Sequence, residues 1–307
     1  MDIFDHSLRQ LDGSELLNET YIKIISEDAR NALEEFEPNS VHLVVTDPPY
    51  FLDGLDTKWR KGKPQPTKST VIGGLPVGMK FDPQQGLDLQ LFMEDIGGKI
   101  YSVLKPGSFA LFFSQPRLSF RMSIGLEDAG FEIRDLYAWR FTKRAQFKAF
   151  TMDHFIDKMD LTQEKKAEIK QSIKNRRTPQ LRPQFEAIIL AQKPKEGTHV
   201  DNWLQYETGL IDASQSLDGN VPSTIMTVEK PKKDSFNGHL TVKPMQLIEY
   251  LIKLFSKQGQ VVLDPFLGSG TTAVACHYTG RSCIGIEINQ DYVDIAKQRL
   301  KEHGYEH

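Results

Sequence analysis

The residues with the clearest chemistry are Asp47-Pro48-Pro49-Tyr50, which directly follow the apolar run 41–45. The run predicts a short buried strand. Two consecutive prolines after it exclude both a helix and a central sheet ladder. The backbone therefore leaves the sheet as a rigid turn that holds a carboxylate, a main-chain carbonyl and an aromatic ring around one point. Open α/β sheets place their ligands at this carboxyl edge of the strands.

Such a turn suits the activation of an amino group on a flat heterocycle. An exocyclic amine of a nucleobase is a poor nucleophile because its lone pair is delocalised into the ring. Hydrogen bonds from its two hydrogens to the Asp47 carboxylate and the Pro48 carbonyl would localise that lone pair and orient the nitrogen for attack on a methyl group. Tyr50 would stack on the base, which has to leave a duplex to reach the turn.

A second chemically suggestive stretch follows the apolar run 261–263. It reads Asp264-Pro265-Phe266-Leu267-Gly268-Ser269-Gly270-Thr271-Thr272. Its two glycines allow a tight turn that a ligand can approach closely. A dinucleotide site would suit such a turn too, but the G-x-G-x-x-G spacing is absent and an acidic residue leads the loop. S-adenosylmethionine is cationic and has no phosphate, so a carboxylate at Asp264 favours it. Glu287, after the next strand, is placed to accept hydrogen bonds from ribose hydroxyls.

The two motifs, in this order, resemble the permuted (β) class of S-adenosylmethionine-dependent DNA amino-methyltransferases, of the adenine-N6 type. The resemblance implies an α/β fold with a doubly wound mixed sheet, Rossmann-like as in methyltransferases, and a small target-recognition insert. It implies methyl transfer from S-adenosyl-L-methionine to the N6 amine of a flipped adenine at specific sites in double-stranded DNA. A cytoplasmic location, in a prokaryotic or phage-infected cell, goes with it. A homodimer and a cognate restriction enzyme are the further partners that this resemblance suggests.

The resemblance also assigns roles to individual residues. The catalytic residues would be Asp47, Pro48, Pro49 and Tyr50. The cofactor-binding residues would be Asp28, Lys243, Asp264, Pro265, Phe266, Gly268, Ser269, Gly270, Thr271 and Glu287. Phe266 would pack against the cofactor, Asp28 would meet its adenine amino group, and Lys243 would lie near its methionine moiety. Asp28 is almost as well explained as a plain helix N-cap. Leu240 departs from the family, which often has proline before Thr241.

The predicted elements alternate between strands and helices, as an α/β fold requires. The predicted strands cover 21–25, 41–45, 109–113, 131–141, 184–191, 261–263 and 282–286. The first predicted helix follows the first strand and ends near Phe36. The other predicted helices cover 87–104, 117–129, 152–174, 241–256, 271–278 and 291–303. The strands 131–141 and 184–191 should pair as a hairpin around the helical insert.

This pattern divides the chain into catalytic and recognition parts. The expected division is a catalytic part at 1–141, a helical insert with probable DNA contacts at 142–183, a returning strand at 184–193, an irregular target-recognition region at 194–237, and a cofactor-binding part at 238–307. The long stretch 51–81 is rich in glycine, proline and lysine, and a loop of this length in a compact domain is usually functional or disordered.

The charge distribution indicates a nucleic-acid partner, although the net charge is only −3. Between Arg140 and Lys195 there are 14 Lys or Arg and 6 Asp or Glu, a local balance of +8 that leaves −11 elsewhere. Such asymmetry is typical of a basic face on an acidic body. The candidate DNA contacts are Lys58, Arg60, Lys61, Arg176, Arg177 and Arg182. The alternative is that 161–177 is a solvated helix and 51–81 a flexible loop with incidental charge.

Several other functions stay open or are disfavoured at this stage. Cytosine-N4 methylation uses the same amine chemistry, and methylation of RNA or of a protein side-chain amide is a more distant alternative. A regulatory protein that binds DNA and cofactor without turnover is opposed by the intact Asp47 and Tyr50. The two cysteines, Cys276 and Cys283, lack metal-ligand spacing, so no metal site is expected. No apolar stretch reaches the length of a membrane span, and the acidic N-terminus lacks a signal-peptide pattern.

Overall fold

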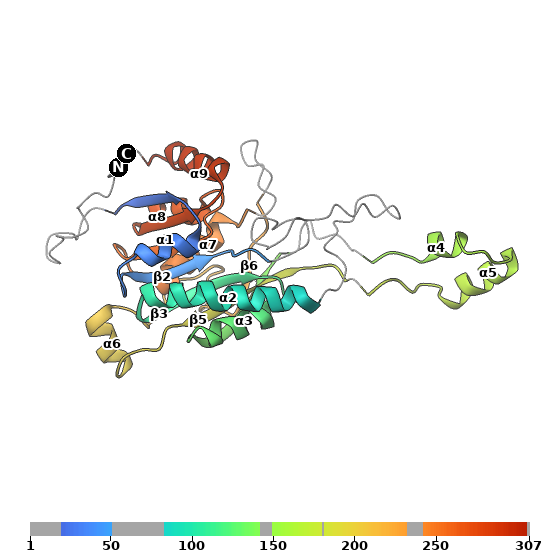
Figure 1. The fold of residues 1–307 in the computed structure, drawn as a ribbon, viewed down its shortest axis with the longest axis horizontal. Coiled ribbons are helices and arrows are strands. Elements are labelled where there is room, and N and C mark those ends of the chain that lie inside the picture. The colour runs from blue at the N-terminus through green and yellow to red at the C-terminus, as the bar shows by residue number, and fades with distance from the viewer. Residues whose placement is uncertain (1–19, 51–82, 142–148, 180, 232–241, 306–307) are drawn as a thin grey trace.

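A mixed sheet of eight strands forms the centre of the computed structural model, which describes residues 20–50, 83–141, 149–179, 181–231 and 242–305 (Figure 1). The strands are β1 (Ile22–Ser26), β2 (Val41–Thr46), β3 (Leu104–Ser114), β4 (Glu132–Arg140), β5 (Phe185–Gln192), β6 (Ile225–Thr227), β7 (Val261–Asp264) and β8 (Ser282–Glu287). Their order is β1-β8-β7-β2-β3-β5-β4-β6. β5 runs antiparallel to β3 and β4, and the other neighbours are parallel.

Helices cover both faces of this sheet. They are α1 (Ala29–Ala32) with the 3-10 turn η2 (Leu33–Glu35), α2 (Pro83–Val103), α3 (Ser119–Asp128), α4 (Asp153–Asp157), α5 (Gln163–Ser172), α6 (His199–Tyr206), α7 (Met245–Phe255), α8 (Thr271–Thr279) and α9 (Gln290–Glu302). Side chains from α1, α2 and α3 form one core, and side chains from α7, α8 and α9 form the other. The predicted mixed α/β fold with helices on both faces of the sheet is therefore confirmed.

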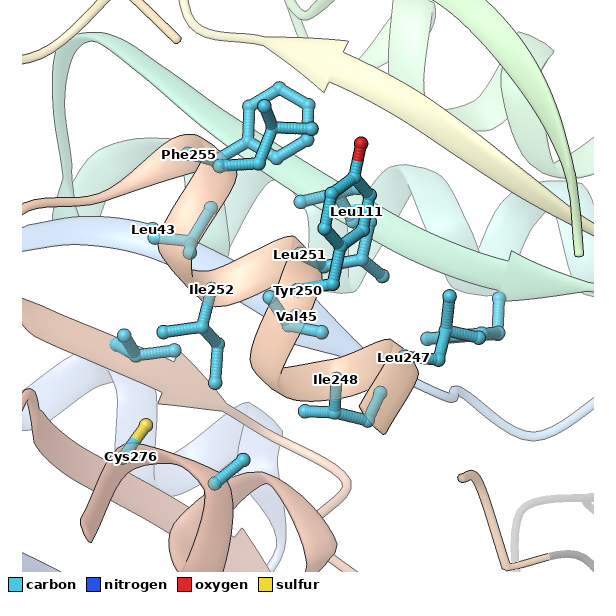
Figure 2. Close-up of a cluster of buried hydrophobic side chains, with 14 of the residues drawn as sticks. Leu43, Val45, Leu111, Leu247, Ile248, Tyr250, Leu251, Ile252, Phe255 and Cys276 are labelled. Carbon is cyan, nitrogen blue, oxygen red and sulfur yellow. The ribbon is translucent and has the colours of Figure 1, made fainter. Parts of the chain in front are cut away.

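β2 carries the Asp-Pro-Pro-Tyr turn and lies deep in the sheet. Leu43 and Val45 point into the core under α7, as Figure 2 shows, whereas Val41 and Val44 point into the core under α2. A strand that is buried on both faces needs a continuous apolar run, which is what the sequence provides. Because β2 pairs with β7 on one side and β3 on the other, its carboxyl end opens between the ends of these two strands.

Two regions are more finely structured than the sequence indicates. Within 194–237, expected to be irregular, the structure contains α6 and β6. α6 begins with a capping box, in which Thr198 and Asp201 satisfy each other's backbone N–H groups. β6 pairs with β4, and the Trp139 indole donates to the Val228 carbonyl at 2.7 Å just after β6. The insert predicted as one helix over 152–174 contains two short helices, because the chain restarts at the N-cap Thr162.

The insert leaves the sheet at the edge that carries the Asp-Pro-Pro-Tyr turn. β4 ends at Arg140 and β5 begins at Phe185, opposite each other in register. α4 and α5 lie far beyond that edge, separate from the sheet and its covering helices (Figure 1). Among the described residues, no helix combines the length and apolar character required to span a bilayer.

Candidate active site

The two motifs found in the sequence meet at the carboxyl edge of the sheet. Thr46, the last residue of β2, donates its hydroxyl to Asp264 Oδ1 at 2.7 Å across 218 positions of sequence. The parallel pairing of β2 with β7, through Val44 and Leu263, brings these strand ends together. The Asp-Pro-Pro-Tyr turn and the glycine loop are therefore parts of one site.

The Asp47 carboxylate is held by two partners. The Tyr50 hydroxyl donates to its Oδ1, and the Lys243 ammonium donates to its Oδ2. The Asp47 side chain is 25% exposed and the Lys243 side chain only 9% exposed. Pro48, which offers no N–H group, is buried beside them. The structure thus gathers the predicted catalytic residues and adds Lys243, which the family resemblance had placed near the methionine moiety of the cofactor.

Lys243 is surrounded by groups that favour its charged form. Its Nζ lies 3.6 Å from Glu186 Oε2 and 4.9 Å from the centre of the Phe113 ring. Burial by itself would lower the pKa of Lys243, but the negative charges of Asp47 and Glu186 raise it above the ordinary lysine value. Lys243 is therefore a buried cation that balances the negative charge of Asp47.

The Asp264 carboxylate, at the end of β7, is buried from solvent. It is 4% exposed, and its Oδ1 also accepts the Phe266 N–H at 3.1 Å, while Oδ2 accepts the Thr272 hydroxyl at 2.6 Å. Burial raises the pKa of Asp264 to about 6, against the opposing effect of these neutral donors, and the nearby Asp47 adds to the rise. The geometry makes Asp264 a brace that joins β2, β7 and α8.

The glycine loop has a backbone that only glycine adopts easily. Gly268 has φ 54° and Gly270 has φ 83°. A Cβ on Gly270 would lie 2.7 Å from the Ala296 Cβ. From α9, Arg299 donates to the carbonyl of Ser269 at 2.6 Å and to the hydroxyl of Thr271 at 3.2 Å. Ser269 and Thr271 thus help to fix the loop conformation, and Pro265 is buried at its start.

Two carboxylates and one aromatic ring lie at the same end of the sheet as the glycine loop. Glu287 accepts the Gly268 N–H at 3.0 Å and the Asn289 N–H at 2.7 Å. Ser26, opposite Glu287 in the β1–β8 register, leads into Asp28. The Phe266 ring centre lies 5.9 Å from that of Phe92 in α2. The structure brings Asp28, Glu287 and Phe266 to the same end of the sheet.

Asp28 is the N-cap of α1, which was the alternative to a cofactor contact for this residue. Its Oδ1 accepts the Arg30 backbone N–H at 2.9 Å, and its Oδ2 accepts the Arg30 guanidinium at 2.6 Å. Burial would raise the pKa of Asp28, but the Arg30 hydrogen bonds and charge hold it below the usual value. Contact with the adenine amino group of a cofactor stays a prediction for this residue.

The predicted DNA contacts lie apart from this centre. Arg176 and Arg177 follow α5, Arg182 precedes β5, and all three are exposed. Lys58, Arg60 and Lys61 lie outside the described residues.

Sequence reasoning missed Arg299 and the pair Glu186 and Lys230. Arg299 sits in an ordinary amphipathic helix, so no local signal distinguishes it. Glu186 did carry a signal, because it interrupts the apolar strand β5 and a charge in a buried strand requires a partner.

One edge of the α/β sheet thus carries both the Asp-Pro-Pro-Tyr turn and the glycine loop. Residues 41–298 match the N6_N4 methylase family, described as DNA methylase, and the chain belongs to this family.

Curated relatives match nearly the whole chain. The Type II methyltransferase M.HindIII of Haemophilus influenzae is 28% identical over 303 residues, with 90% of this chain and 94% of the relative covered. The Type II methyltransferase M.HpaI of Haemophilus parainfluenzae is 27% identical, with 91% and 74% covered.

Solved structures show the same fold. The M1.HpyAVI–SAM complex has a TM-score of 0.55 at 19% identity, with 91% of this chain and 100% of that chain covered. The cytosine-N4-specific PvuII DNA methyltransferase has a TM-score of 0.62 at 15% identity, with 94% of this chain and 89% of that chain covered.

Proposed function

We propose that this DNA methylase transfers a methyl group to the N6 amine of adenine at a specific DNA sequence, with S-adenosyl-L-methionine as donor and Asp47-Pro48-Pro49-Tyr50 as its catalytic turn. The observation that carries the proposal is the contact between Thr46 and Asp264. This hydrogen bond joins the strand end before the Asp-Pro-Pro-Tyr turn to the start of the glycine loop, and such closeness supports the proposal that the turn activates an amine and the loop binds the methyl donor. The order of the two motifs along the chain supports the permuted β class.

The residues of the loop fit this donor. Glu287 and Asp28 provide acceptors for hydroxyl and amino groups, and Phe266 provides a ring for a flat heterocycle. The backbone at Gly268 and Gly270 allows close approach. The donor is a cationic nucleoside without phosphate, which this acidic and aromatic set matches better than it matches a dinucleotide. When bound, S-adenosyl-L-methionine would supply a methyl group on positively charged sulfur; the target amine would take this methyl group and lose one proton, and the sulfur would leave as a neutral thioether.

The chain's own residues prepare the amine for this attack. The amine donates one hydrogen bond to the Asp47 carboxylate and one to the Pro48 carbonyl, which concentrates the lone pair on nitrogen. Tyr50 moves from Asp47 onto the face of the flipped base and so exchanges one hydrogen bond for stacking. The strand β2, rigid and buried on both faces, fixes the position of the turn.

Cytosine-N4 methylation is the second candidate, because the amine chemistry is shared and one similar fold is titled cytosine-N4-specific. Asp47 at the first position of the turn favours adenine by family resemblance.

The Type II class of the relatives further supports site-specific protection of DNA in the cytoplasm against a cognate restriction endonuclease. Light scattering with and without DNA tests whether the enzyme acts as a homodimer.

Asp47→Ala tests the catalytic assignment. We expect the single-turnover rate of methyl transfer to fall by about 10²–10³-fold, since an acceptor aimed at the reacting group is removed, while DNA and cofactor affinities change little. Mass spectrometry of digested DNA nucleosides measures both the rate and the modified base. Asp135→Ala, at an exposed position of β4, is the control and should retain wild-type rates. An undiminished rate in Asp47→Ala would remove the turn from the chemistry, and N4-methylcytosine as product would select the second candidate.

A further inference from the structure

Four charges of alternating sign lead away from the catalytic turn. Lys243 bonds Asp47 and lies 3.6 Å from Glu186 Oε2, and Lys230 Nζ lies 2.6 Å from Glu186 Oε1. The four residues come from separate segments. Asp47 lies in the turn after β2, Lys243 just before α7, Glu186 at the start of strand β5, and Lys230 in the segment after β6. The series therefore links the turn to the strands on the recognition side of the sheet.

Lys243 is the most deeply buried of these four residues. Its side chain is 9% exposed and lies over the Phe113 ring. A buried ammonium needs anionic partners because desolvation of an unpaired charge is costly. Glu186 supplies a second anion beside Asp47, and Lys230, placed over the Phe141 ring at 4.1 Å, holds Glu186 from its other side. Lys243 consequently has little room to leave Asp47 when substrate enters.

The two oxygens of Asp47 have unequal partners. Oδ1 accepts from Tyr50 and Oδ2 accepts from the anchored Lys243. In the proposed reaction Tyr50 leaves Oδ1 and stacks on the flipped base, whereas Lys243 stays on Oδ2. A carboxylate on its own rotates between broad minima about its terminal torsion. A fixed partner on Oδ2 removes this rotation and leaves Oδ1 directed at the incoming amine.

We propose that Lys243, anchored by Glu186, is a positioning residue that orients the Asp47 carboxylate, and that it does not bind the cofactor. This inference rests on the proposed amine methylation, with Asp47 as the group that touches the substrate. Lys243 acts only through Asp47, and Glu186 acts only through Lys243. The consequence is a defect in the chemical step with cofactor affinity preserved.

The kinetic test uses Lys243→Met, Lys243→Arg, Glu186→Gln and the Lys243→Met/Glu186→Gln double variant. Single-turnover rates are measured at saturating DNA and cofactor, and cofactor affinity by calorimetry. We expect Lys243→Met to lower the rate by about 10²-fold, the effect of a misplaced reacting group, with cofactor affinity within about threefold. Lys243→Arg should recover much of the rate. The double variant should be no slower than Lys243→Met, because Glu186 works through Lys243.

Lys257→Met is the matched control. Lys257 also pairs with a glutamate, Glu207 at 2.6 Å, and also lies over an aromatic ring, Trp203 at 5.5 Å, but it has no contact with the turn. Its rate and affinity should equal those of the wild type. Cofactor affinity that falls in parallel with the rate in Lys243→Met would overturn the proposal, as would additive effects of Lys243→Met and Glu186→Gln.

A labelling experiment tests the same network without turnover. Competitive acylation followed by mass spectrometry reports the reactivity of each lysine amine, and only the uncharged amine reacts. Asp47→Asn and Glu186→Gln should each increase Lys243 labelling several-fold and leave Lys257 unchanged. Unchanged Lys243 labelling in both variants would refute the network even if Lys243→Met fails to fold. A wild-type protein that methylates no DNA would refute the proposed function instead, while the labelling result still decides the contact.

Discussion

Two Asp-Pro pairs of the same local sequence have different roles because their surroundings differ. Asp47 has a lysine as a charged partner and is a quarter exposed, so its carboxylate can meet a substrate. Asp264 is 4% exposed, and within the described part of the chain its donors are neutral: two threonine hydroxyls and one backbone N–H. A carboxylate at the tip of a strand is therefore not by itself a ligand contact. Its role depends on which donors the neighbouring strands provide.

Asp264→Asn tests the bracing role at the level of stability. The folded pKa of Asp264 is about 6 and its ordinary value is 3.8. Between these values the folded state binds the extra proton, so this group lowers the unfolding free energy as pH rises from about 4 to about 6, by at most about 3 kcal/mol. Above pH 6 the effect is constant. Asp264→Asn should remove this component, and urea unfolding at a series of pH values measures it.

The same variant separates bracing from cofactor contact. Asparagine keeps most of the hydrogen bonds without the charge, so cofactor affinity should stay close to the wild-type value, whereas Asp264→Ala should lose about 1–3 kcal/mol of stability and weaken cofactor binding through the loop. Equal pH dependence in the wild type and Asp264→Asn would contradict the raised pKa. A large loss of cofactor affinity in Asp264→Asn would restore the direct charge contact.

At the level of elements, the connection from β7 to α8 is fixed from two sides. Gly270 adopts a left-handed conformation as the N-cap of α8 and packs against Ala296 of α9. Arg299, one turn further along α9, holds the loop carbonyl and hydroxyls. α9 thus helps to hold the glycine loop in its conformation.

Gly270→Ala should destabilise the fold more than its backbone conformation alone explains. The φ of 83° is costly for alanine, and the new Cβ would lie 2.7 Å from the Ala296 Cβ. We expect a loss of about 2–4 kcal/mol in urea unfolding, with weaker cofactor binding. Gly259→Ala is the control, because its φ is 80° and a Cβ there meets nothing within 4 Å. It should cost only about 1–2 kcal/mol. Equal losses in the two variants would exclude the contact with Ala296 as the cause.

For the whole molecule, the insert and the active site share one side. The arm with α4 and α5 leaves the sheet between β4 and β5, at the edge that carries Asp47, and projects well beyond it (Figure 1). A bound duplex that delivers a flipped base to this edge would pass the arm. The range of the family match, 41–298, spans the arm.

Replacement of Arg176, Arg177 and Arg182 by glutamine tests the arm as a DNA contact. Each lost phosphate contact should reduce the slope of log affinity against log salt by roughly 0.9, while cofactor affinity remains unchanged. Fluorescence anisotropy with a cognate duplex at several salt concentrations measures this slope. The control replaces the exposed Lys23, Lys297 and Lys301 on β1 and α9 and should leave the slope intact. An unchanged slope in the arginine variant would make the cluster an ordinary solvated face and direct attention to Lys58, Arg60 and Lys61.

The sequence alone determined what depends on local backbone geometry. Apolar runs followed by Pro-Pro or Gly-x-Gly define strands that end in a turn, and the alternation of strands and helices defines the mixed α/β sheet with these turns at one edge. These features follow from φ/ψ restrictions and side-chain periodicity, which act over a few residues.

Only the tertiary structure decided which distant groups meet. The contact between Lys243 and Asp47 spans 196 positions, and the burial of Asp264 depends on hydroxyls from β2 and α8. The pairing of β6 with β4, in a region without a clear period, likewise depends on an edge that the rest of the sheet provides. Such contacts are set by strand order and by the desolvation of charges on packing, and neither is encoded in the residue spacing around any one of these side chains.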